Sequence, residues 1–228
     1  MNAKDYEEAE EIAKGDKNLM STVEMVRDFV SDPEVRSLFD RDKLKELQEQ
    51  GKNPFEITKY NRTNSAGEIK ANYEKFEQKD VSVAGRIIAK RIMGKASFCT
   101  ILDSDEKIQS YVSINDLGEE SYKAFKTFDI GDIIGITGFV FKTRTEEISV
   151  HAKEVVLLSK SLRPLPEKFH GLTDTEERYR RRYVDLIMNE EARNVAFTRP
   201  KIIRCIQNFM DNLGFTEVET PVLQTLLT

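Results

Sequence analysis

Four arginines stand within five positions of the chain and bring together a concentrated set of charged hydrogen-bond donors: Arg178, Arg180, Arg181 and Arg182. Each guanidinium is planar, permanently charged and shaped to hold a phosphate or a carboxylate with two parallel hydrogen bonds. Runs of charge usually form a solvated face. On a helix, however, these four positions point in several directions, so some of them must contact something else. The pattern predicts RNA, a carboxylate or another domain as that contact.

The cysteines and histidines do not predict a metal centre. Cys99 and Cys205 lie far apart in the sequence, and His151 and His170 are the only histidines. No spacing among these residues matches a metal-ligand pattern. Two distant cysteines are typical of free thiols in a reducing compartment. We therefore expect no metal ion, two unpaired cysteines and a cytoplasmic location.

The composition predicts a folded, charge-rich protein of one or two domains. The chain has 228 residues, of which 39% are hydrophobic and 33% are charged, and this is enough to bury a core. The net charge of -5 argues against a strongly basic nucleic-acid binder. The excess of acid lies in the first forty residues, however, and the near-neutral remainder can still present a basic face. No run of ~18 apolar residues indicates a membrane span, and the N-terminus is unlike a signal or transit peptide.

Composition and periodicity divide the chain into five parts. These are an acidic N-terminal extension (1–40), an N-terminal helical segment (41–79), a β domain (80–160), a linker (161–190) and a last helix with the segment that follows it (191–228). The extension has only weak helical periodicity, and nothing in it indicates chemistry.

A first clear helix is predicted over residues 32–50. Asp32 is its expected N-cap, Pro33 occupies its first position, and Gly51 is placed to end it. A second, shorter helix is expected within residues 65–76. Both helices precede the β domain, so they are expected to flank it.

From residue 80 the hydrophobic period changes to two, which is typical of half-buried strands. Strands are expected at about 80–87, 97–103, 108–114, 131–141 and 148–158, with a turn at Met93-Gly94-Lys95. A polar, helix-like segment at 116–127 separates the third strand from the fourth. Three meander strands, a helix and a hairpin are the order of a five-stranded oligonucleotide/oligosaccharide-binding (OB) barrel. The ligand face of such a barrel lies on its second and third strands.

The last part of the chain is predicted to be helical. Thr173 and Glu176 have the spacing of a capping box ahead of the four arginines. A long amphipathic helix is expected over residues 191–213, and Pro200 within it predicts either a kink or a fresh start. Gly214 is placed to end this helix.

Several segments resemble the bacterial class II lysyl-tRNA synthetases, in the order of that family. They are Arg91-Ile92-Met93-Gly94-Lys95-Ala96-Ser97-Phe98, Leu162-Arg163-Pro164-Leu165-Pro166-Glu167-Lys168-Phe169-His170-Gly171-Leu172, Arg178-Tyr179-Arg180-Arg181-Arg182-Tyr183-Val184-Asp185-Leu186, and Gly214-Phe215-Thr216-Glu217-Val218-Glu219-Thr220-Pro221, which is similar to motif 1 of class II. The resemblance covers residues 41–228. Aspartyl or asparaginyl relatives are an alternative, but the second segment favours the lysyl enzymes.

The resemblance implies an α+β fold that is mainly β. The expected architecture is a five-stranded OB-fold barrel with N-terminal helices, followed by a helical linker and by the first helix and strand (motif 1) of a class II catalytic domain. The expected partner is the anticodon loop of tRNA(Lys). Phe98 matches the family's base-stacking aromatic, Gln109 and Glu147 match groups that hydrogen-bond the edge of the central uridine, and Arg91 matches a cation near the loop.

Cations on nearby loops are candidate phosphate contacts under the same resemblance: Lys90, Lys95, Lys142 and Arg144. Motif 1 implies a homodimer interface, for which the matching or adjoining residues are Ile202, Ile206, Phe209, Gly214, Phe215, Val218 and Pro221. Residues 215–221 are expected to form a short strand. A free-standing OB-fold protein that binds single-stranded RNA in general is the second hypothesis, and an assembly partner without RNA affinity is the third.

Catalysis in this family requires motifs 2 and 3, which lie downstream of motif 1. The parent enzyme would use ATP and Mg²⁺ to activate lysine and transfer it to tRNA(Lys). No such motif stands between motif 1 and Thr228. We therefore expect no catalytic residue, no metal ligand and no bound cofactor in these 228 residues, and no activity from this chain alone.

Overall fold

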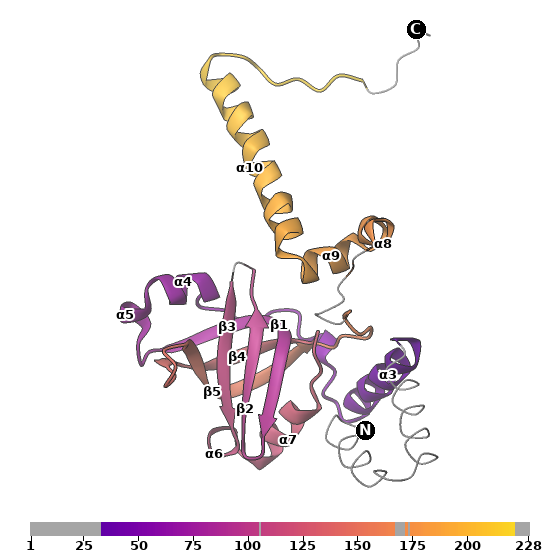
Figure 1. The fold of residues 1–228 in the computed structure, drawn as a ribbon, viewed down its shortest axis with the longest axis vertical. Helices are drawn as coiled ribbons and strands as arrows, with labels where there is room; N and C mark the ends of the chain where they lie inside the picture. The colour runs from indigo at the N-terminus through magenta and orange to yellow at the C-terminus, as the bar shows by residue number, and fades with distance from the viewer. Residues whose placement is uncertain (1–32, 105, 167–171, 173, 222–228) are drawn as a thin grey trace, which may run out of the picture. The chain divides into compact units, whose positions relative to one another are not determined.

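Five strands close into a barrel in the part of the chain that the structure describes, with the strand order β1-β2-β3-β5-β4 (Figure 1). The structure is a computed structural model and describes residues 33–104, 106–166, 172 and 174–221. The strands are β1 (Asp80–Met93), β2 (Ala96–Leu102), β3 (Lys107–Ser113), β4 (Ile133–Lys142) and β5 (Ile148–Ser159). The predicted OB-fold barrel is thus confirmed, and β1 runs six residues further than the expected strand at 80–87.

Strand alternation separates an apolar interior from an outer surface that carries polar and aromatic groups. On β2, Cys99 and Ile101 are fully buried, while Phe98 and Thr100 between them are partly exposed. This follows from the two-residue period of a strand. The interior is completed by residues of the same phase on the other strands: Val81, Val83, Ile108, Val112, Ile134, Ile136, Val140 and Val150.

Adjacent strands pair antiparallel, except that β3 pairs parallel with β5. This parallel contact closes the barrel, with Gln109 facing Ser149 and Tyr111 facing His151. Gly138 lies where β4 and β5 come closest: a Cβ there would stand 1.9 Å from the His151 carbonyl oxygen. Only glycine permits that approach without a backbone shift.

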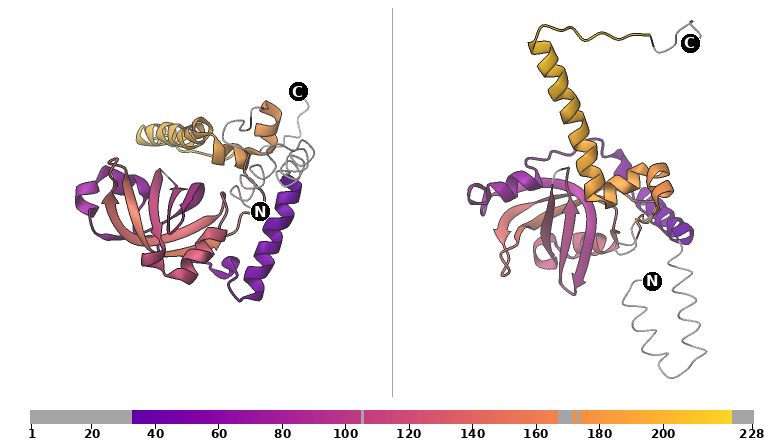
Figure 2. Two further views of the ribbon diagram at one scale, coloured as in Figure 1. Left: turned by 60° about the horizontal axis from the view of Figure 1, so that its bottom comes forward. Right: turned by 45° about the horizontal axis from the view of Figure 1, so that its top comes forward.

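Two short helices cover one end of the barrel between β3 and β4 (Figure 2). They are α6 (Ile114–Leu117) and α7 (Glu119–Thr127), which replace the single helix expected at 116–127. The break falls at Gly118, whose φ of 82° is outside the helical range. Tyr122 is buried on α7 and holds the β1–β2 turn, since its hydroxyl lies 2.8 Å from Ser97 Oγ and 3.0 Å from the Gly94 carbonyl.

The N-terminal helices lie in the same compact unit as the barrel. Helix α3 (Pro33–Glu49) ends as expected at Gly51, which has φ 68°, and Asp32 lies outside the described residues. A 3-10 turn, η1 (Pro54–Glu56), follows. The helix expected at 65–76 is two helices, α4 (Ala66–Ala71), which the side chain of Ser65 caps, and α5 (Tyr73–Phe76). The expected extension at 1–40 lies mostly outside the described residues.

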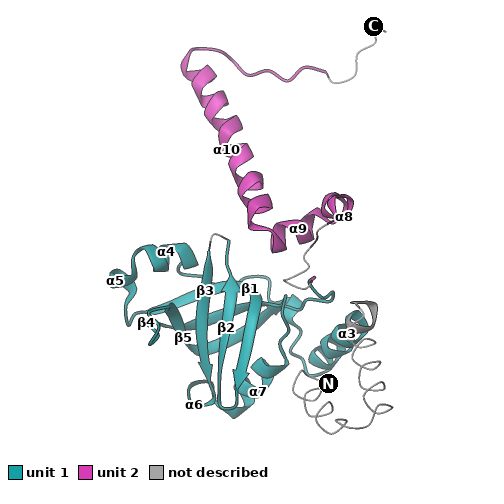
Figure 3. Ribbon diagram, viewed as in Figure 1, with its two compact units in different colours: residues 1–165 teal, residues 166–228 magenta. Residues whose placement is uncertain are grey.

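The chain separates into two compact units, residues 1–165 and 166–228, and all the regular structure described in the second unit is helical (Figure 3). It contains α8 (Thr175–Arg180), α9 (Arg182–Met188) and α10 (Glu190–Asn212). The N-cap of α8 is Asp174, whose carboxylate accepts from Glu177 N at 2.8 Å. The expected cap, Thr173, lies outside the described residues.

The four clustered arginines, at positions 178, 180, 181 and 182, all pair with carboxylates within residues 176–185. Arg178 and Arg182 hold Asp185, which is 1% exposed, at 2.9 and 2.6 Å. Arg180 pairs with Glu176 and Arg181 with Glu177 one turn away. Of the three contacts predicted for the cluster, a carboxylate is therefore the one observed. The buried carboxylate explains why two guanidinium groups converge there.

Helix α10 continues through Pro200 without a fresh start. It ends at Gly214, which has φ 84° and so allows the left-handed cap conformation. Residues 215–221 form no strand in the described structure, contrary to the expectation, because a strand requires a partner to satisfy its backbone and none pairs with them among the described residues. No described helix combines the length and the apolar character needed to cross a membrane.

Candidate nucleic-acid interface

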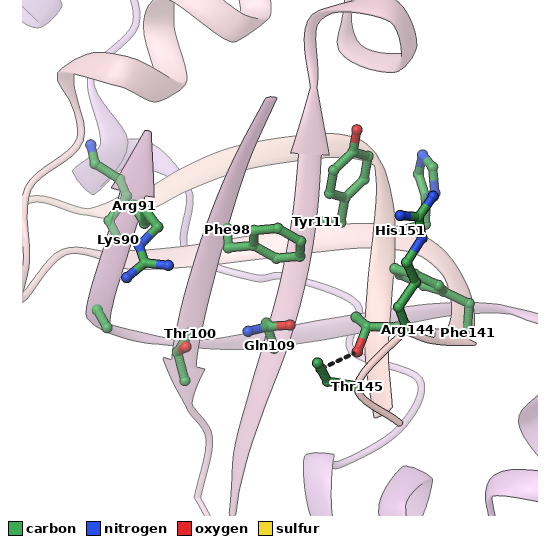
Figure 4. Close-up of a pocket in the computed structure, with 12 residues that line it drawn as sticks. Lys90, Arg91, Phe98, Thr100, Gln109, Tyr111, Phe141, Arg144, Thr145 and His151 are labelled. Carbon is green, nitrogen blue, oxygen red and sulfur yellow. Dashed lines mark hydrogen bonds between the residues drawn. The ribbon is translucent and has the colours of Figure 1, made fainter. Parts of the chain in front are cut away.

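One row of side chains crosses the outer face of the barrel through all five strands. The register places Arg91 beside Phe98, Phe98 beside Tyr111, Tyr111 beside His151, and His151 beside Phe139. A residue's cross-strand neighbours lie on the same face of a sheet. The row is therefore a continuous aromatic strip with a guanidinium at its β1 end, and Figure 4 shows its members from Arg91 to His151.

A second row runs beside the first and consists of Ala89, Thr100, Gln109, Ser149 and Phe141. Ser149 Oγ donates to Gln109 Oε1 at 3.1 Å, which turns the amide nitrogen of Gln109 away from Ser149 and toward Thr100 (Figure 4). This side chain is thereby oriented as a donor along the floor of the groove.

All members of the two rows except Phe139 and Ser149 line an open groove of about 1010 Å³. Its lining comes from all five strands and the β4–β5 turn: Ala89, Lys90, Arg91, Phe98, Thr100, Gln109, Tyr111, Phe141, Thr143, Arg144, Thr145 and His151. Pockets that enclose a drug-sized ligand measure about 300–1,000 Å³. The groove therefore has room for more than one nucleotide.

The rings in the groove contact one another at defined angles. The centroids of Phe98 and Tyr111 are 5.4 Å apart with the planes at 60°. His151 stacks on Phe139 at 4.6 Å and 22°, and meets Tyr111 at 5.0 Å and 68°. These are the offset and edge-to-face geometries that aromatic quadrupoles favour. Phe98 is partly exposed, so part of its ring is free to stack with a base.

The electrostatic character of the groove suits a polyanion. Lys90, Arg91 and Arg144 are in its lining, and no Asp or Glu is. The Lys90 ammonium, however, donates to the carbonyl oxygens of Phe125 (3.4 Å), Lys126 (3.1 Å) and Phe128 at the end of α7. Burial lowers the pKa of Lys90. All three of its donors are used, so this lysine stabilises the helix terminus and has none left for a phosphate.

Three other predicted residues are not in the lining of the groove. Lys95 is exposed in the β1–β2 turn, and the Lys142 ammonium lies 4.6 Å from the ring centroid of Tyr73. Glu147 is exposed at the start of β5, 4.0 Å from Lys70. The structure thus brings together Arg91, Phe98, Gln109 and Arg144.

The sequence prediction missed Tyr111, Phe141 and His151, which line the same groove. Tyr111 follows Gln109 by two positions, so strand alternation would have placed both on one face. His151 joins them only through the parallel pairing of β3 with β5. No pattern within a single strand contains that information.

A carboxylate outside the groove fixes His151. Asp116, on α6, accepts a hydrogen bond from His151 Nε2 at 2.8 Å. Ser113 Oγ donates to the same carboxylate oxygen and also accepts from Asp116 N at 3.3 Å. The hydrogen bonds from Ser113 and then from His151 lower the pKa of Asp116. The carboxylate is therefore ionised at neutral pH.

The described residues do not fit ATP and Mg²⁺. They contain no group of three or more His, Cys, Asp or Glu that could hold a metal ion, and the lining of the groove offers no carboxylate to a cation. No catalytic step can be derived from these residues.

The helical unit presents a long apolar face to solvent. Along α10, Ile202, Ile206 and Phe209 are 56%, 59% and 62% exposed, and their spacing puts them on one side of the helix. Phe215 and Val218 beyond Gly214 are also exposed. A contiguous apolar face of this kind marks an interaction surface.

Comparisons with known proteins agree with the barrel and the helical unit. Residues 81–158 match the family model described as an OB-fold nucleic acid binding domain. Residues 174–228 match the model for class II tRNA synthetases (D, K and N). The two matches follow one another in the order that the sequence resemblance implied.

Curated relatives extend the likeness over most of the chain. The lysine–tRNA ligase of Clostridium novyi is 55% identical over 184 residues, which is 81% of this chain and 36% of that protein. The lysine–tRNA ligase of Clostridium tetani is 49% identical over 211 residues, covering 92% of this chain and 41% of that protein. That of Clostridium acetobutylicum is 52% identical over 186 residues.

The chain thus spans about two fifths of the length of the curated relatives that it matches. The groove, the barrel topology and the helical unit all lie within the matched residues. Together with the identity to these ligases, the two family matches show that the chain belongs to the class II lysine–tRNA ligase family.

Proposed function

We propose that the groove binds the anticodon loop of tRNA(Lys), with the central uridine stacked on Phe98. One observation supports this most strongly: Arg91, Phe98 and Gln109 converge in one groove of an OB-fold barrel. An unpaired base stacked on an aromatic ring gains about 1–3 kcal/mol whatever its identity. Recognition of uridine must therefore come from groups at its edge.

Gln109 and Glu147 supply the complementary edge in this proposal. Uridine presents two carbonyl acceptors and one imino donor, and the Gln109 amide nitrogen is oriented as a donor by Ser149. The Glu147 carboxylate would accept the imino proton. To do so it must leave Lys70, an exposed contact at 4.0 Å that contributes little. Cytidine has an acceptor at the same position and would face the lone pairs of the carboxylate.

The phosphates of the loop would be held by Arg91 and Arg144, the two guanidinium groups in the lining. Lys95 and Lys142 lie further out and would contribute only long-range attraction. Lys90 is proposed to support the barrel alone, since its ammonium is bound to carbonyl oxygens.

The remaining family properties are also proposals for this chain. The apolar face of α10 would form a homodimer interface with a second copy of the chain. The whole enzyme would join lysine to tRNA, as the name lysine–tRNA ligase of its relatives states, and the family resemblance implies that it would use ATP and Mg²⁺ and act on tRNA(Lys). The buried, unpaired thiol of Cys99 is what a cytoplasmic protein is expected to have.

The test is binding of a labelled lysine anticodon stem-loop to the 228-residue chain at fixed moderate salt. A second stem-loop carries cytidine at the central position. We expect clear preference for uridine, which Glu147→Gln abolishes, and a loss of about 5- to 150-fold for Phe98→Ala. Phe55→Ala is the matched control, because Phe55 is exposed but outside the groove.

Two other results are informative. Equal binding of both stem-loops, falling steeply with salt, would indicate a general single-stranded RNA-binding barrel in place of a uridine reader. No binding to either stem-loop would leave assembly through α10 as the function of these residues.

A further inference from the structure

Asp116 lies outside the groove, but it holds the imidazole of His151, which lines the groove. Its carboxylate holds His151 Nε2 at 2.8 Å and is itself held by Ser113. The contact joins α6 to β5, two elements that are far apart in the sequence. A hydrogen bond to an ionised acceptor is stronger than a neutral one, so this pair sets the orientation of the imidazole.

The neighbouring rings complete the fixation of His151. One side of the imidazole stacks on Phe139 at 4.6 Å, and Phe141 lies 5.7 Å away. Tyr111 meets it at 5.0 Å and 68°. With an edge bonded to Asp116 and a face covered by Phe139, the imidazole is a rigid support against which Tyr111 rests.

Tyr111 occupies the centre of the groove, between Phe98 and His151. Its ring is 5.4 Å from Phe98 and is partly exposed. The groove continues past it to Thr143, Arg144 and Thr145 on the β4–β5 turn. A second unpaired nucleotide placed beyond Phe98 would therefore meet the Tyr111 ring, with the Arg144 guanidinium available for its phosphate.

We propose that Tyr111 is a second base-stacking ring, for a nucleotide adjacent to the one on Phe98, and that Asp116 is a positioning residue that acts on Tyr111 through His151. This inference rests on the proposed anticodon-binding function. A ring that is already immobilised loses less conformational freedom when RNA binds. We expect that advantage to amount to about 2- to 12-fold in affinity.

Whether removal of Asp116 weakens or tightens RNA binding distinguishes a positioning role from a purely electrostatic one. Asp116 is a negative charge near a groove for a polyanion, so removing it through charge alone would tighten RNA binding. Removing a positioning residue weakens binding. Glu119→Ala is the matched control, because it deletes one carboxylate at an exposed position of the neighbouring helix α7, where Glu119 forms an exposed ion pair with Lys123 at 2.9 Å.

The experiment measures affinities of the full 228-residue chain for four lysine anticodon stem-loops. One is intact, and the others lack the base at the central position, at the position before it or at the position after it. The variants are Asp116→Ala, Asp116→Asn, Tyr111→Ala, Phe98→Ala and Glu119→Ala, each first checked for an unchanged circular dichroism spectrum and melting temperature.

For the intact stem-loop we expect Asp116→Ala to weaken binding by about 2- to 12-fold and Tyr111→Ala by about 5- to 150-fold. Both effects should disappear on one of the two loops that lack a flanking base, and should persist on the loop that lacks the central base. The effect of Phe98→Ala should instead disappear on the loop that lacks the central base and persist on both loops that lack a flanking base. Asp116→Asn keeps a carbonyl acceptor for His151 and should recover most of the affinity.

The inference is overturned if Asp116→Ala behaves like Glu119→Ala, or if it weakens all four stem-loops equally, as a general loss of structure would. In either case the wild-type preference for uridine would still support the proposed function. If the wild-type chain binds none of the four loops, the proposed function fails and this inference fails with it.

Discussion

Arg91 and Lys95 are four residues apart at the end of the first hairpin, but only Arg91 lines the groove. Its backbone pairs with Phe98, so its guanidinium starts beside the stacking ring. Lys95 follows Gly94 in the turn and is exposed. A cation in direct contact with a phosphate releases counterions when RNA binds, whereas a cation outside the contact distance is screened.

This difference predicts unequal effects of two alanine substitutions on anticodon stem-loop binding. Arg91→Ala should weaken binding and reduce the slope of log K against log salt by about 1. Lys95→Ala, which removes the same charge, should leave the slope unchanged. Fluorescence anisotropy over a salt series measures both quantities. Equal slopes for the two variants would mean that Arg91 makes no phosphate contact.

At the scale of elements, a buried group of charges connects α3 to the barrel. The Lys160 ammonium, at the end of β5, lies 2.6 Å from Asp129 and 3.0 Å from Asp132. Lys43, on α3, lies 2.7 Å from Asp129 and 3.7 Å from Asp40. Lys160 and Asp132 are buried, so these contacts are shielded from salt.

The pKa values of this group give a pH dependence of stability. Burial alone would raise the pKa of Asp129, but hydrogen bonds from Lys160 and Lys43 outweigh it and lower the pKa. Burial would lower the pKa of Lys160, but Asp132 and Asp129 outweigh that and raise it. The stability from Asp129 is therefore present above the ordinary value of about 3.9 and is lost as pH falls through the lower folded pKa. The stability from Lys160 is present below about 10.4 and is lost at higher pH.

We predict that Lys160→Met lowers the free energy of unfolding at pH 7 by about 3–5 kcal/mol, because it removes the ion-pair partner of the buried Asp132. The same variant should lose less stability than the wild type between pH 5 and pH 3. Protonation of the buried carboxylates that faced Lys160 then removes their uncompensated charge from the native state. Urea unfolding followed by circular dichroism measures both.

Lys153→Met is the control for Lys160→Met. It removes a lysine of β5, the strand that Lys160 directly follows, but the partner contact, to Asp80 at 2.6 Å, is exposed. We expect a change of at most about 1 kcal/mol for the control. If both variants lower the free energy of unfolding by the same amount, the buried group of charges does not stabilise the junction of α3 with the barrel.

The strands were predictable from sequence because every second residue of a strand faces the barrel interior and is apolar, and this two-residue period is visible in the sequence. Four of the five strands were placed to within about two residues at each end, and β1 was correct at its start but was predicted too short. The turn at Gly94 followed from residue type. The helix between β3 and β4 was expected, but its break was not, since Gly118 inside a helical pattern is compatible with either outcome.

The groove was only partly predictable, because it depends on pairing between strands. Phe98, Gln109 and Arg91 came from the family resemblance, and the register of β1, β2 and β3 brings them together. His151 reaches the same groove through the parallel contact of β3 with β5. Lys90 was expected to contact a phosphate, and no local pattern reveals that its ammonium, although in the lining, donates to carbonyl oxygens at the end of α7.

At the scale of the whole molecule, the two compact units have opposite surface chemistry. The barrel unit hides its apolar residues in a core and exposes a basic, aromatic groove. The helical unit exposes Ile202, Ile206 and Phe209 along α10. Burying such side chains gains about 1.5–3 kcal/mol each, which would contribute to the association with a second copy that we propose.

We therefore predict that the chain dimerises through α10 and that Ile206→Asp raises the dissociation constant by about 30-fold or more, the effect of losing an interface hot spot. Asn208→Asp is the matched control, because it adds the same charge about half a turn away from Ile206. Sedimentation equilibrium over a range of concentrations measures both. RNA binding should be unaffected by Ile206→Asp, since the barrel lies in the other compact unit. A monomeric wild-type chain, or equal dissociation by the two substitutions, would show that this face is not the interface.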